Sequence, residues 1–354
     1  MASTIEDVAA RAGVSTATVS RAMRGLDGVS KRSRDKVLEA ARELGYVVSP
    51  TAQALATGHT GMIAVIVPTF NEWFSANVLE GAQRRLQSAG LLTAVLSASA
   101  VRGRPDYDVD VASLRRRIDG VVNVSLPLTD EETREVAGLG VPVIAVGNPS
   151  PPFASVSLAD REAGRIATRH LVNLGHRVIA YISGSRDELE PNAPGGQRLE
   201  GWRDVLVEEG LEHGPDLVVN SFFDVRGGHD AVLELLGRRP DVTAVFAAAD
   251  MIATGAMVAL SEYGLRVPED ISIIGVDGDD TDPWVQLTTV VQDPAEMGAM
   301  AADLLLQIIG GGAVPETTLV HGRLRPGRTT ARPRDPEAAD ASPPAAPPAA
   351  SLAN

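Results

Sequence analysis

The chain has 354 residues, a net charge of −14 and a hydrophobic share of 44%, which suits two or three globular domains. It has no cysteine, so it can form neither disulfides nor thiolate metal sites, and its six histidines show no ligand spacing. We therefore expect no metal and no cofactor. No apolar run approaches the roughly 20 residues of a membrane span, and no export signal begins the chain. These features predict a cytoplasmic protein without a membrane partner.

The charge is unevenly distributed along the chain. Residues 1–60 carry eight Arg/Lys and six Asp/Glu, a net charge of +2, and the remainder has a net charge of −16. A mildly basic N-terminal segment on an acidic body is typical of a protein that presents one end to nucleic acid.

The N-terminal segment has the pattern of two short helices joined by a tight turn. Apolar residues recur at helical spacing from Ile5 to Ala12, Gly13 interrupts them, and the pattern resumes up to Met23. In a helix-turn-helix the second helix enters the major groove, and its first residues contact base edges. Ser15 would be the N-cap of that helix. A third helix, capped by Ser30, would close the small core.

The stretch TIEDVAARAGVSTATVSR, the third helix VLEAARELGY and the segment SPTAQALATG resemble the LacI/GalR family of transcriptional repressors. By this resemblance Thr16 and Ala17 occupy positions that vary with the operator, and Arg21 is the usual base-contacting arginine. The residues expected to contact DNA are Thr4, Ser15, Thr16, Ala17, Thr18, Ser20, Arg21, Ser30 and Leu55.

Residues 49–58 begin with Ser and an early Pro, followed by good helix formers, but are too few for a stable isolated helix. The resemblance implies a hinge helix that pairs with a second copy and inserts Leu55 into the minor groove. A family member often has Pro-Asn before this helix, whereas this chain has Val48 and Ser49. A plain interdomain linker is the alternative.

From Gly61 onward, short apolar strands alternate with amphipathic helices, which is the pattern of parallel α/β sheets. Strands are expected at 62–67, 91–96, 120–124, 142–146, 178–182, 217–219, 244–248 and 271–276. Helices are expected near 75–89, 108–117, 130–139, 161–174, 196–209, 228–237 and 250–263. The predicted fold is an all-α helix-turn-helix head with a two-lobed α/β body of parallel sheets that is like a periplasmic binding protein.

The body also carries stretches that resemble the LacI/GalR effector domain, among them LVNLGHRVIAYISG, QRLEGW and LTTVVQD, and the resemblance spans about residues 3–330. We expect a head at residues 1–48, a hinge or linker at 49–60, a body at 61–330 and a disordered Pro/Ala-rich tail at 331–354. Since the family's chain crosses between lobes three times, lobe 1 should comprise about residues 61–157 and 289–318, and lobe 2 about residues 158–288 and 319–330.

Ligands of open parallel sheets bind at the carboxyl ends of the strands. The residues with suitable chemistry near those ends are Phe70, Trp73, Phe74, Asn123, Ser125, Arg198, Phe223, Asp250 and Asp277. Aromatic rings stack on sugar or purine planes, and a guanidinium with carboxylates satisfies paired hydroxyls.

By resemblance, four of these residues match family positions that contact effector: Phe74, Arg198, Phe223 and Asp277. Gln292 matches another family position near the cleft between the two lobes of the body. The family often has Asn-Asp where this chain has Ala249 and Asp250, so one polar contact is missing. Asp250 itself has an alternative role as a helix N-cap.

These observations predict a ligand-responsive transcriptional regulator, a repressor that binds a palindromic operator as a homodimer. Its effector would be a sugar or sugar derivative, with a purine as second choice, bound in the cleft between the two lobes. The alternatives are a transporter's solute-binding protein, which should carry an export signal and no head, and a cytoplasmic enzyme. No GxGxxG, GxxxxGK[ST] or GxSxG motif occurs, so we expect no catalytic residues.

Overall fold

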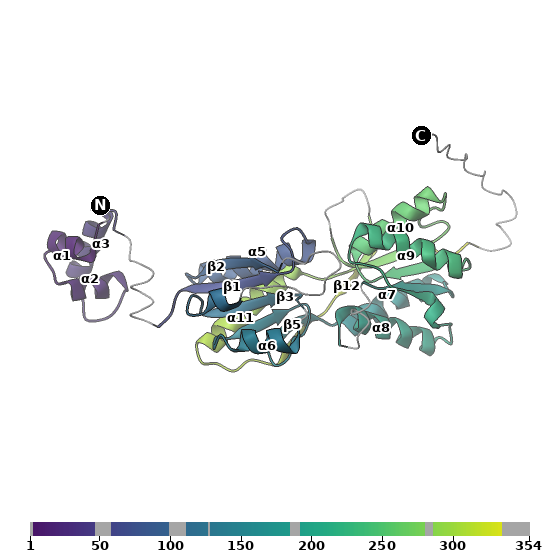
Figure 1. The fold of residues 1–354 in the computed structure, drawn as a ribbon. Helices are drawn as coiled ribbons and strands as arrows, with labels where there is room; N and C mark the ends of the chain where they lie inside the picture. The colour runs from purple at the N-terminus through teal and green to yellow at the C-terminus, as the bar shows by residue number, and fades with distance from the viewer. Residues whose placement is uncertain are drawn as a thin grey trace, which may run out of the picture. The chain divides into compact units, whose positions relative to one another are not determined.

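The computed structural model describes residues 3–46, 58–98, 111–126, 128–184, 192–279 and 286–334. They form a helical head and an α/β body (Figure 1). The fold class expected from the sequence is confirmed. The expected hinge leucine and the C-terminal tail beyond residue 334 lie outside the described residues.

The head consists of three helices, α1 (Ile5–Ala12), α2 (Thr16–Met23) and α3 (Lys31–Glu43). Val8, Val19 and Val37 contribute one fully buried side chain from each helix to a single core. Gly13 ends α1 with φ +66° and ψ 39°, a left-handed conformation that residues with a Cβ adopt at a cost. This turn sets the angle at which α2 leaves α1.

The first lobe of the body is a six-stranded sheet in the order β11-β5-β4-β3-β1-β2. Its elements are β1 (Met62–Val67), α5 (Trp73–Ser88), β2 (Leu92–Ser97), η1 (Val111–Leu114), β3 (Gly120–Val124), α6 (Asp130–Ala137), β4 (Val143–Val146), β5 (Ala154–Leu158), α11 (Pro294–Ile309) and β11 (Thr317–Val320). Strands β1, β3 and β4 consist almost wholly of buried residues, as expected where helices cover both faces of a parallel sheet.

The second lobe is a six-stranded sheet in the order β12-β10-β9-β8-β6-β7, in which only β10 and β12 are recorded as antiparallel. Its elements are α7 (Asp160–Leu174), β6 (Ile179–Ile182), α8 (Pro194–Glu208), η3 (Pro215–Leu217), β7 (Val218–Val219), α9 (Val225–Arg238), β8 (Ala244–Ala247), α10 (Asp250–Glu262), β9 (Ser272–Asp277), β10 (Thr288–Val291) and β12 (Arg323–Arg325). Helices α7 and α8 pack together on one face, and α9 and α10 on the other (Figure 1).

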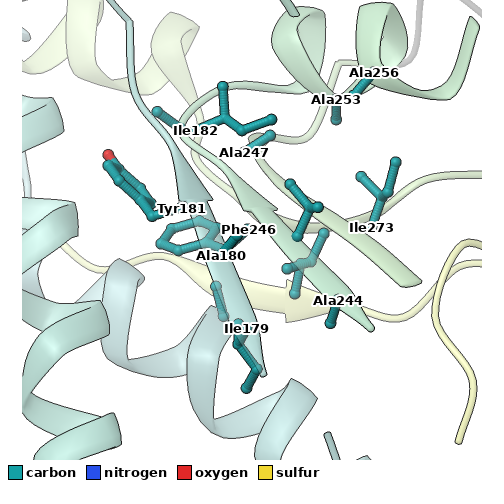
Figure 2. Close-up of a cluster of buried hydrophobic side chains, with 14 of the residues drawn as sticks. Ile179, Ala180, Tyr181, Ile182, Ala244, Phe246, Ala247, Ala253, Ala256 and Ile273 are labelled. Atoms are coloured by element: carbon teal, nitrogen blue, oxygen red, sulfur yellow. The ribbon is translucent and has the colours of Figure 1, made fainter. Parts of the chain in front are cut away.

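The core of the second lobe is centred on β6 and β8 (Figure 2). Tyr181 and Phe246 lie on these neighbouring strands with ring centroids 5.1 Å apart and planes tilted by 58°. Trp202 of α8 packs against the same tyrosine. The Tyr181 hydroxyl donates to the carbonyl oxygen of Gly195 at 2.8 Å, which ties the first turn of α8 to the sheet.

The chain passes between the lobes three times, from β5 to α7, from β10 to α11 and from β11 to β12. The sequence placed the second crossing near residue 288, whereas β10 belongs to the second sheet and ends at Val291. The first and third crossings lie side by side, since the N–H of Ala159 donates to the carbonyl oxygen of Val320 at 2.8 Å. Because the connections are short, the carboxyl ends of β5, β10 and β11 all adjoin the other lobe.

Helices α7 and α8 approach each other at two glycines. A Cβ on Gly164 would lie 2.2 Å from the carbonyl oxygen of Arg198, and one on Gly201 would lie 2.1 Å from that of Arg161. Only residues without a Cβ allow this spacing. The contact places α7 directly against the backbone of Arg198.

Two local expectations need correction. A helix was expected near 108–117, but in the described part of that range, from residue 111 onward, the chain forms only the 3-10 turn η1. Strands β5, β10, β11 and β12 and helix α11 were not foreseen; in these strands Ser, Thr and Arg interrupt the apolar pattern. Among the described helices, none combines the length and apolar character needed to cross a bilayer.

Candidate functional site

The head presents the start of α2 to solvent. Thr16, Ala17 and Arg21 are all exposed, as the sequence predicted for side chains that would reach base edges. The Ser15 hydroxyl accepts the N–H of Thr18 at 3.2 Å and so serves as the N-cap of α2. Ser20 lies half-buried on the same helix.

The guanidinium of Arg21 is held against the loop that follows α2. Its Nε and Nη2 donate to the carbonyl oxygen of Asp27 at 3.3 and 3.1 Å. Arg34 of α3 donates from Nη2 to the carbonyl oxygen of Leu26, at 2.7 Å, in the same loop. A base contact by Arg21 would therefore exchange these two long bonds for bonds to DNA.

Two other expected DNA contacts have structural roles in this conformation. Thr4 and Asp7 form a capping box at the start of α1, with both reciprocal bonds present. The Ser30 hydroxyl accepts the N–H of Ser33 and caps α3. Leu55 lies outside the described residues, so its insertion into the minor groove stays a prediction.

The first lobe places its candidate ligand residues around the carboxyl ends of β1 and β3. Phe70 is 60% exposed, Trp73 begins α5, and Phe74 packs against the lobe's core. Asn123 is 2% exposed; its amide nitrogen donates to the carbonyl oxygen of Leu126, and its Oδ1 has no partner among the described residues. An unpaired buried acceptor is costly unless a ligand or water supplies a donor.

Arg198 is the centre of a buried polar cluster in the second lobe. It is 5% exposed, its Nε donates to Asp160 Oδ1 at 2.8 Å, and its Nη1 donates to the carbonyl oxygen of Ala248 at 2.5 Å. Burial works to lower the pKa of Arg198, but the negative charges of Asp160 and Asp277 outweigh it and raise that pKa. The guanidinium is therefore charged at every physiological pH.

Asp160 forms an ion pair with this guanidinium. Burial raises the pKa of the Asp160 carboxyl, whereas Arg198 lowers it. A charged guanidinium without a counter-ion in this interior would be far less stable than the pair, so Asp160 is ionised. Asp160 was not among the expected ligand residues, because the serines of β5 hide that strand in the sequence; its position just after a strand is the signal that points to it.

Asp277, the last residue of β9, lies half-buried and accepts from Gln292 Nε2 through Oδ1 at 2.7 Å. Its φ of 138° is unusual for a residue with a Cβ. The backbone N–H of Gln292 donates to the Asp277 carbonyl oxygen at 3.0 Å as well. Two bonds thus tie Asp277 to the residue that follows β10.

Asp250 begins α10 but does not cap it, since the N-cap is Ala249. Its Oδ2 accepts the N–H groups of Gly278 and Asp279 at 2.8 and 2.9 Å, and its Oδ1 accepts the Thr289 hydroxyl at 2.6 Å. Oδ2 therefore holds the chain directly after β9, and Oδ1 binds strand β10.

The two carboxyls influence each other's titration. Burial raises the pKa of Asp250 to about 6, against hydrogen bonds that lower it. Burial and the nearby Asp250 raise the pKa of Asp277 to about 7, while Arg198 and Gln292 act to lower it. Near neutral pH the pair therefore holds a proton part of the time.

Phe223 and Ser183 complete this part of the lobe. The Phe223 ring fills the space beside Gly184, where a Cβ would lie 2.1 Å from the ring. The Ser183 hydroxyl, directly after β6, is fully buried and has no hydrogen-bond partner among the described residues. Its place after a strand was the signal that could have identified it.

No group of metal-ligating side chains occurs in the described part of the chain.

Comparison with protein families identifies both parts of the chain. Residues 4–49 match the family described as bacterial regulatory proteins, lacI family, and residues 168–330 match the periplasmic binding protein-like domain. The HTH-type transcriptional regulator CelR of Thermobifida fusca is 35% identical over 90% of this chain and 95% of its own length. GalS of Salmonella typhimurium is 34% identical over 90% of this chain and 93% of its own length.

Solved structures agree with these matches. The Lac repressor dimer bound to operator and the anti-inducer ONPF superposes with a TM-score of 0.80, at 29% identity, over 94% of this chain and all of that one. The complex of the regulator CelR with cellobiose gives a TM-score of 0.68, at 31% identity, over 92% and 99% of the two chains. These relatives are regulators and not enzymes. The chain belongs to the LacI family of DNA-binding transcriptional regulators, with a periplasmic-binding-protein-like effector domain.

Proposed function

We propose that this regulator is a repressor that binds a two-fold symmetric operator as a homodimer and responds to a sugar or sugar derivative in its second lobe. The observation that carries the effector role is that Arg198, a buried donor of α8, and Asp277, a half-buried acceptor at the carboxyl end of β9, lie close enough for the guanidinium to lower the pKa of the carboxyl. Convergent polar groups at such an edge are typical of ligand sites.

The choice of a sugar is supported by the relatives. A structure of the regulator CelR was solved as a complex with cellobiose, and CelR of Thermobifida fusca is among the similar sequences. The donor and acceptor of this chain suit vicinal hydroxyls, one of which accepts while the other donates. Cellobiose is therefore the first probe.

The pair is connected to two of the three crossings between lobes. Asp160, bound to Arg198, is the first residue of α7, two positions after β5 ends. Gln292, bound to Asp277, directly follows β10 and precedes α11. A ligand that moves either side chain would move a crossing, and so the lobe that leads to the head. Coupling of this kind is typically about 1–3 kcal/mol and reciprocal between effector and operator.

A second copy would cover the outer face of α9 and α10. Val225 and Val258 are each 44% exposed there, and Arg226, His229 and Asp230 line the shallow hollow between them. Arg226 and Asp230 carry opposite charges four residues apart on α9. Under two-fold symmetry each can therefore face its opposite in the partner, which is the self-complementarity that an isologous interface requires.

Operator binding can be tested with the full chain on duplexes selected from a random pool. We expect Arg21→Ala to lose discrimination between the selected and a scrambled duplex. Arg11→Ala removes the same charge from the head at a site paired with Glu43, so it should only weaken binding to both duplexes. The absence of any preferred duplex for the wild-type chain at low salt would exclude the proposed function.

The effector role can be tested on the same duplex. We expect cellobiose to change operator affinity 5- to 150-fold in the wild type, and Gln292→Ala to reduce that change more than it reduces cellobiose affinity. An operator affinity that no sugar alters would remove the effector part of the proposal and leave DNA binding intact.

A further inference from the structure

We propose that the pairing of two copies through α9 and α10 is controlled by pH, and that the doubly protonated ring of His229 is the form that stabilises the dimer. The inference rests on the self-interface proposed above for the hollow between these helices, which His229 lines. It adds a second input to the regulator, because a two-fold symmetric operator binds both heads of a dimer.

The first step is the protonation state that the surroundings of His229 require. The ring is 26% exposed, its Nδ1 lies 2.9 Å from Asp230 Oδ1 and its Nε2 lies 3.0 Å from Glu262 Oε2. An ionised carboxylate only accepts hydrogen bonds, whereas a neutral imidazole has one N–H and one acceptor nitrogen. Both contacts are therefore hydrogen bonds only when both ring nitrogens carry a proton.

The same two carboxylates favour that form energetically. The hydrogen bonds from His229 to Glu262 and Asp230 raise the pKa of the imidazole above its ordinary value of 6.5, whereas burial acts to lower it. Loss of a proton leaves one nitrogen with a lone pair directed at a carboxylate oxygen, so one of the two contacts must break. The structure thus shows the arrangement of the protonated ring.

The second step is the charge of this face. Arg226 lies 3.9 Å from Asp230 on α9, and Glu262 faces His229 from α10. When His229 is protonated, two positive groups balance the two carboxylates and the net charge of the four residues is zero. When His229 is neutral, Arg226 alone opposes two carboxylates, and the net charge is −1.

Two-fold symmetry doubles this imbalance, because each copy presents the same face to the other. With both histidines neutral, the interface would hold a net charge of −2, between chains that each carry −14. Like charges that face each other across an interface lower affinity. Glu234 and Arg238, the next ion pair along α9, balance each other and add no net charge. Dimer formation should therefore favour protonation of His229.

The test measures the Kd of the dimer for the full chain, labelled at its N-terminus, by fluorescence-detected sedimentation at constant ionic strength. We expect Kd to rise about tenfold or more between about pH 6 and about pH 8.5, since a pKa one unit higher in the dimer at each of two histidines changes Kd by up to ~100-fold. An equal or lower Kd at the higher pH overturns the proposal and leaves the dimer itself intact. A monomer at both pH values removes the self-interface as well.

His229→Gln tests whether this ring is the group that titrates. Glutamine can still donate a hydrogen bond but cannot take up a proton, so we expect a Kd that is independent of pH and near that of the wild type at about pH 8.5. His213→Gln is the matched control, because it removes an exposed imidazole of the same lobe that contacts the carbonyl oxygen of Leu211. It should keep the full pH dependence. A wild-type pH dependence in His229→Gln would assign the effect to another group.

Glu262→Gln tests the charge argument by its sign. Arg226 and Asp230 then balance each other, so the face is neutral when His229 is neutral and positive when it is protonated. Kd should therefore rise toward about pH 6 instead of toward about pH 8.5, and a direction unchanged from the wild type would contradict the reasoning.

The two variants also cover each other. Glu262 is 63% exposed, so its variant remains informative if His229→Gln fails to fold by circular dichroism. None of these measurements uses DNA or sugar, so their outcome is independent of the operator and effector assays.

Discussion

Gly201→Ala should destabilise the second lobe, although alanine is the better helix former. Gly201 lies within α8, and the new Cβ would be placed 2.1 Å from the carbonyl oxygen of Arg161 and 2.8 Å from the backbone nitrogen of Arg165. Both atoms belong to the backbone of α7, so no rotamer change relieves the contact. Because a Cβ normally stays at least about 3.0 Å from such an atom, the helices must separate by about 1 Å.

The magnitude follows from two opposing effects. Replacing glycine by alanine in a helix stabilises by about 1 kcal/mol, whereas forcing an additional methyl group into a packed contact costs about 1–3 kcal/mol and occasionally more. Separation of α7 from α8 would also lengthen the 2.8 Å bond between Asp160 and Arg198, one residue of which lies on each helix. A lost partner in a buried ion pair costs roughly 3–5 kcal/mol, so a net loss of about 2 kcal/mol is expected.

Urea unfolding followed by circular dichroism measures this loss. Gly237→Ala is the matched control, because it lies in α9 with no atom within 4 Å of the new Cβ. It should stabilise the chain by up to about 1 kcal/mol. If Gly201→Ala proves as stable as Gly237→Ala, the close approach of α7 and α8 is not the reason for glycine at this position.

Four further predictions concern pH, assembly and the hinge. Because the pKa of Asp277 is raised to about 7, the free energy of unfolding should be highest below about pH 4 and fall by roughly 2–4 kcal/mol as the pH rises through about 7. Unfolding curves measured over this pH range should show no such fall for Asp277→Asn. The pKa of His176 is lowered by burial, so its own contribution to stability should fall as the pH drops below 6.5, opposite in sign to that of Asp277; a His176→Asn variant with the same acid-side profile as the wild type would contradict that. Val225→Glu should shift the chain toward monomers in sedimentation velocity, whereas Val207→Glu, on α8 and 55% exposed, should not; equal behaviour would refute the α9/α10 interface. Leu55→Ala should weaken specific operator binding at unchanged Tm, and unaltered affinity would exclude its insertion into the minor groove.

Local patterns were sufficient where a segment's neighbours in sequence decide its structure. The head's helices begin at side chains that cap their own first turns. Gly13 ends α1 in a left-handed conformation, which a glycine adopts without the steric cost of a Cβ. Strands 62–67 and 120–124 were predicted with the bounds that the structure shows, because fully buried parallel strands are continuous apolar runs.

Contacts between distant segments decided the rest. Strand β5 has alternating serines, and pairs with β4 and β11 despite a weak apolar pattern. Without that strand, nothing in the sequence placed Asp160 opposite Arg198, 38 residues later. Nor could it show that both oxygens of Asp250 bind the chain beyond β9.

The sequence by itself determined the family, the order of head and body, and the kinds of side chain at the carboxyl ends of the strands, because these depend on local spacing and composition. Only the tertiary structure decided which carboxylate neutralises Arg198, which one holds the chain after β9 and which one binds Gln292. Those roles depend on burial and on distances between segments far apart in the chain, since a charge's partners and its pKa are properties of its surroundings in space.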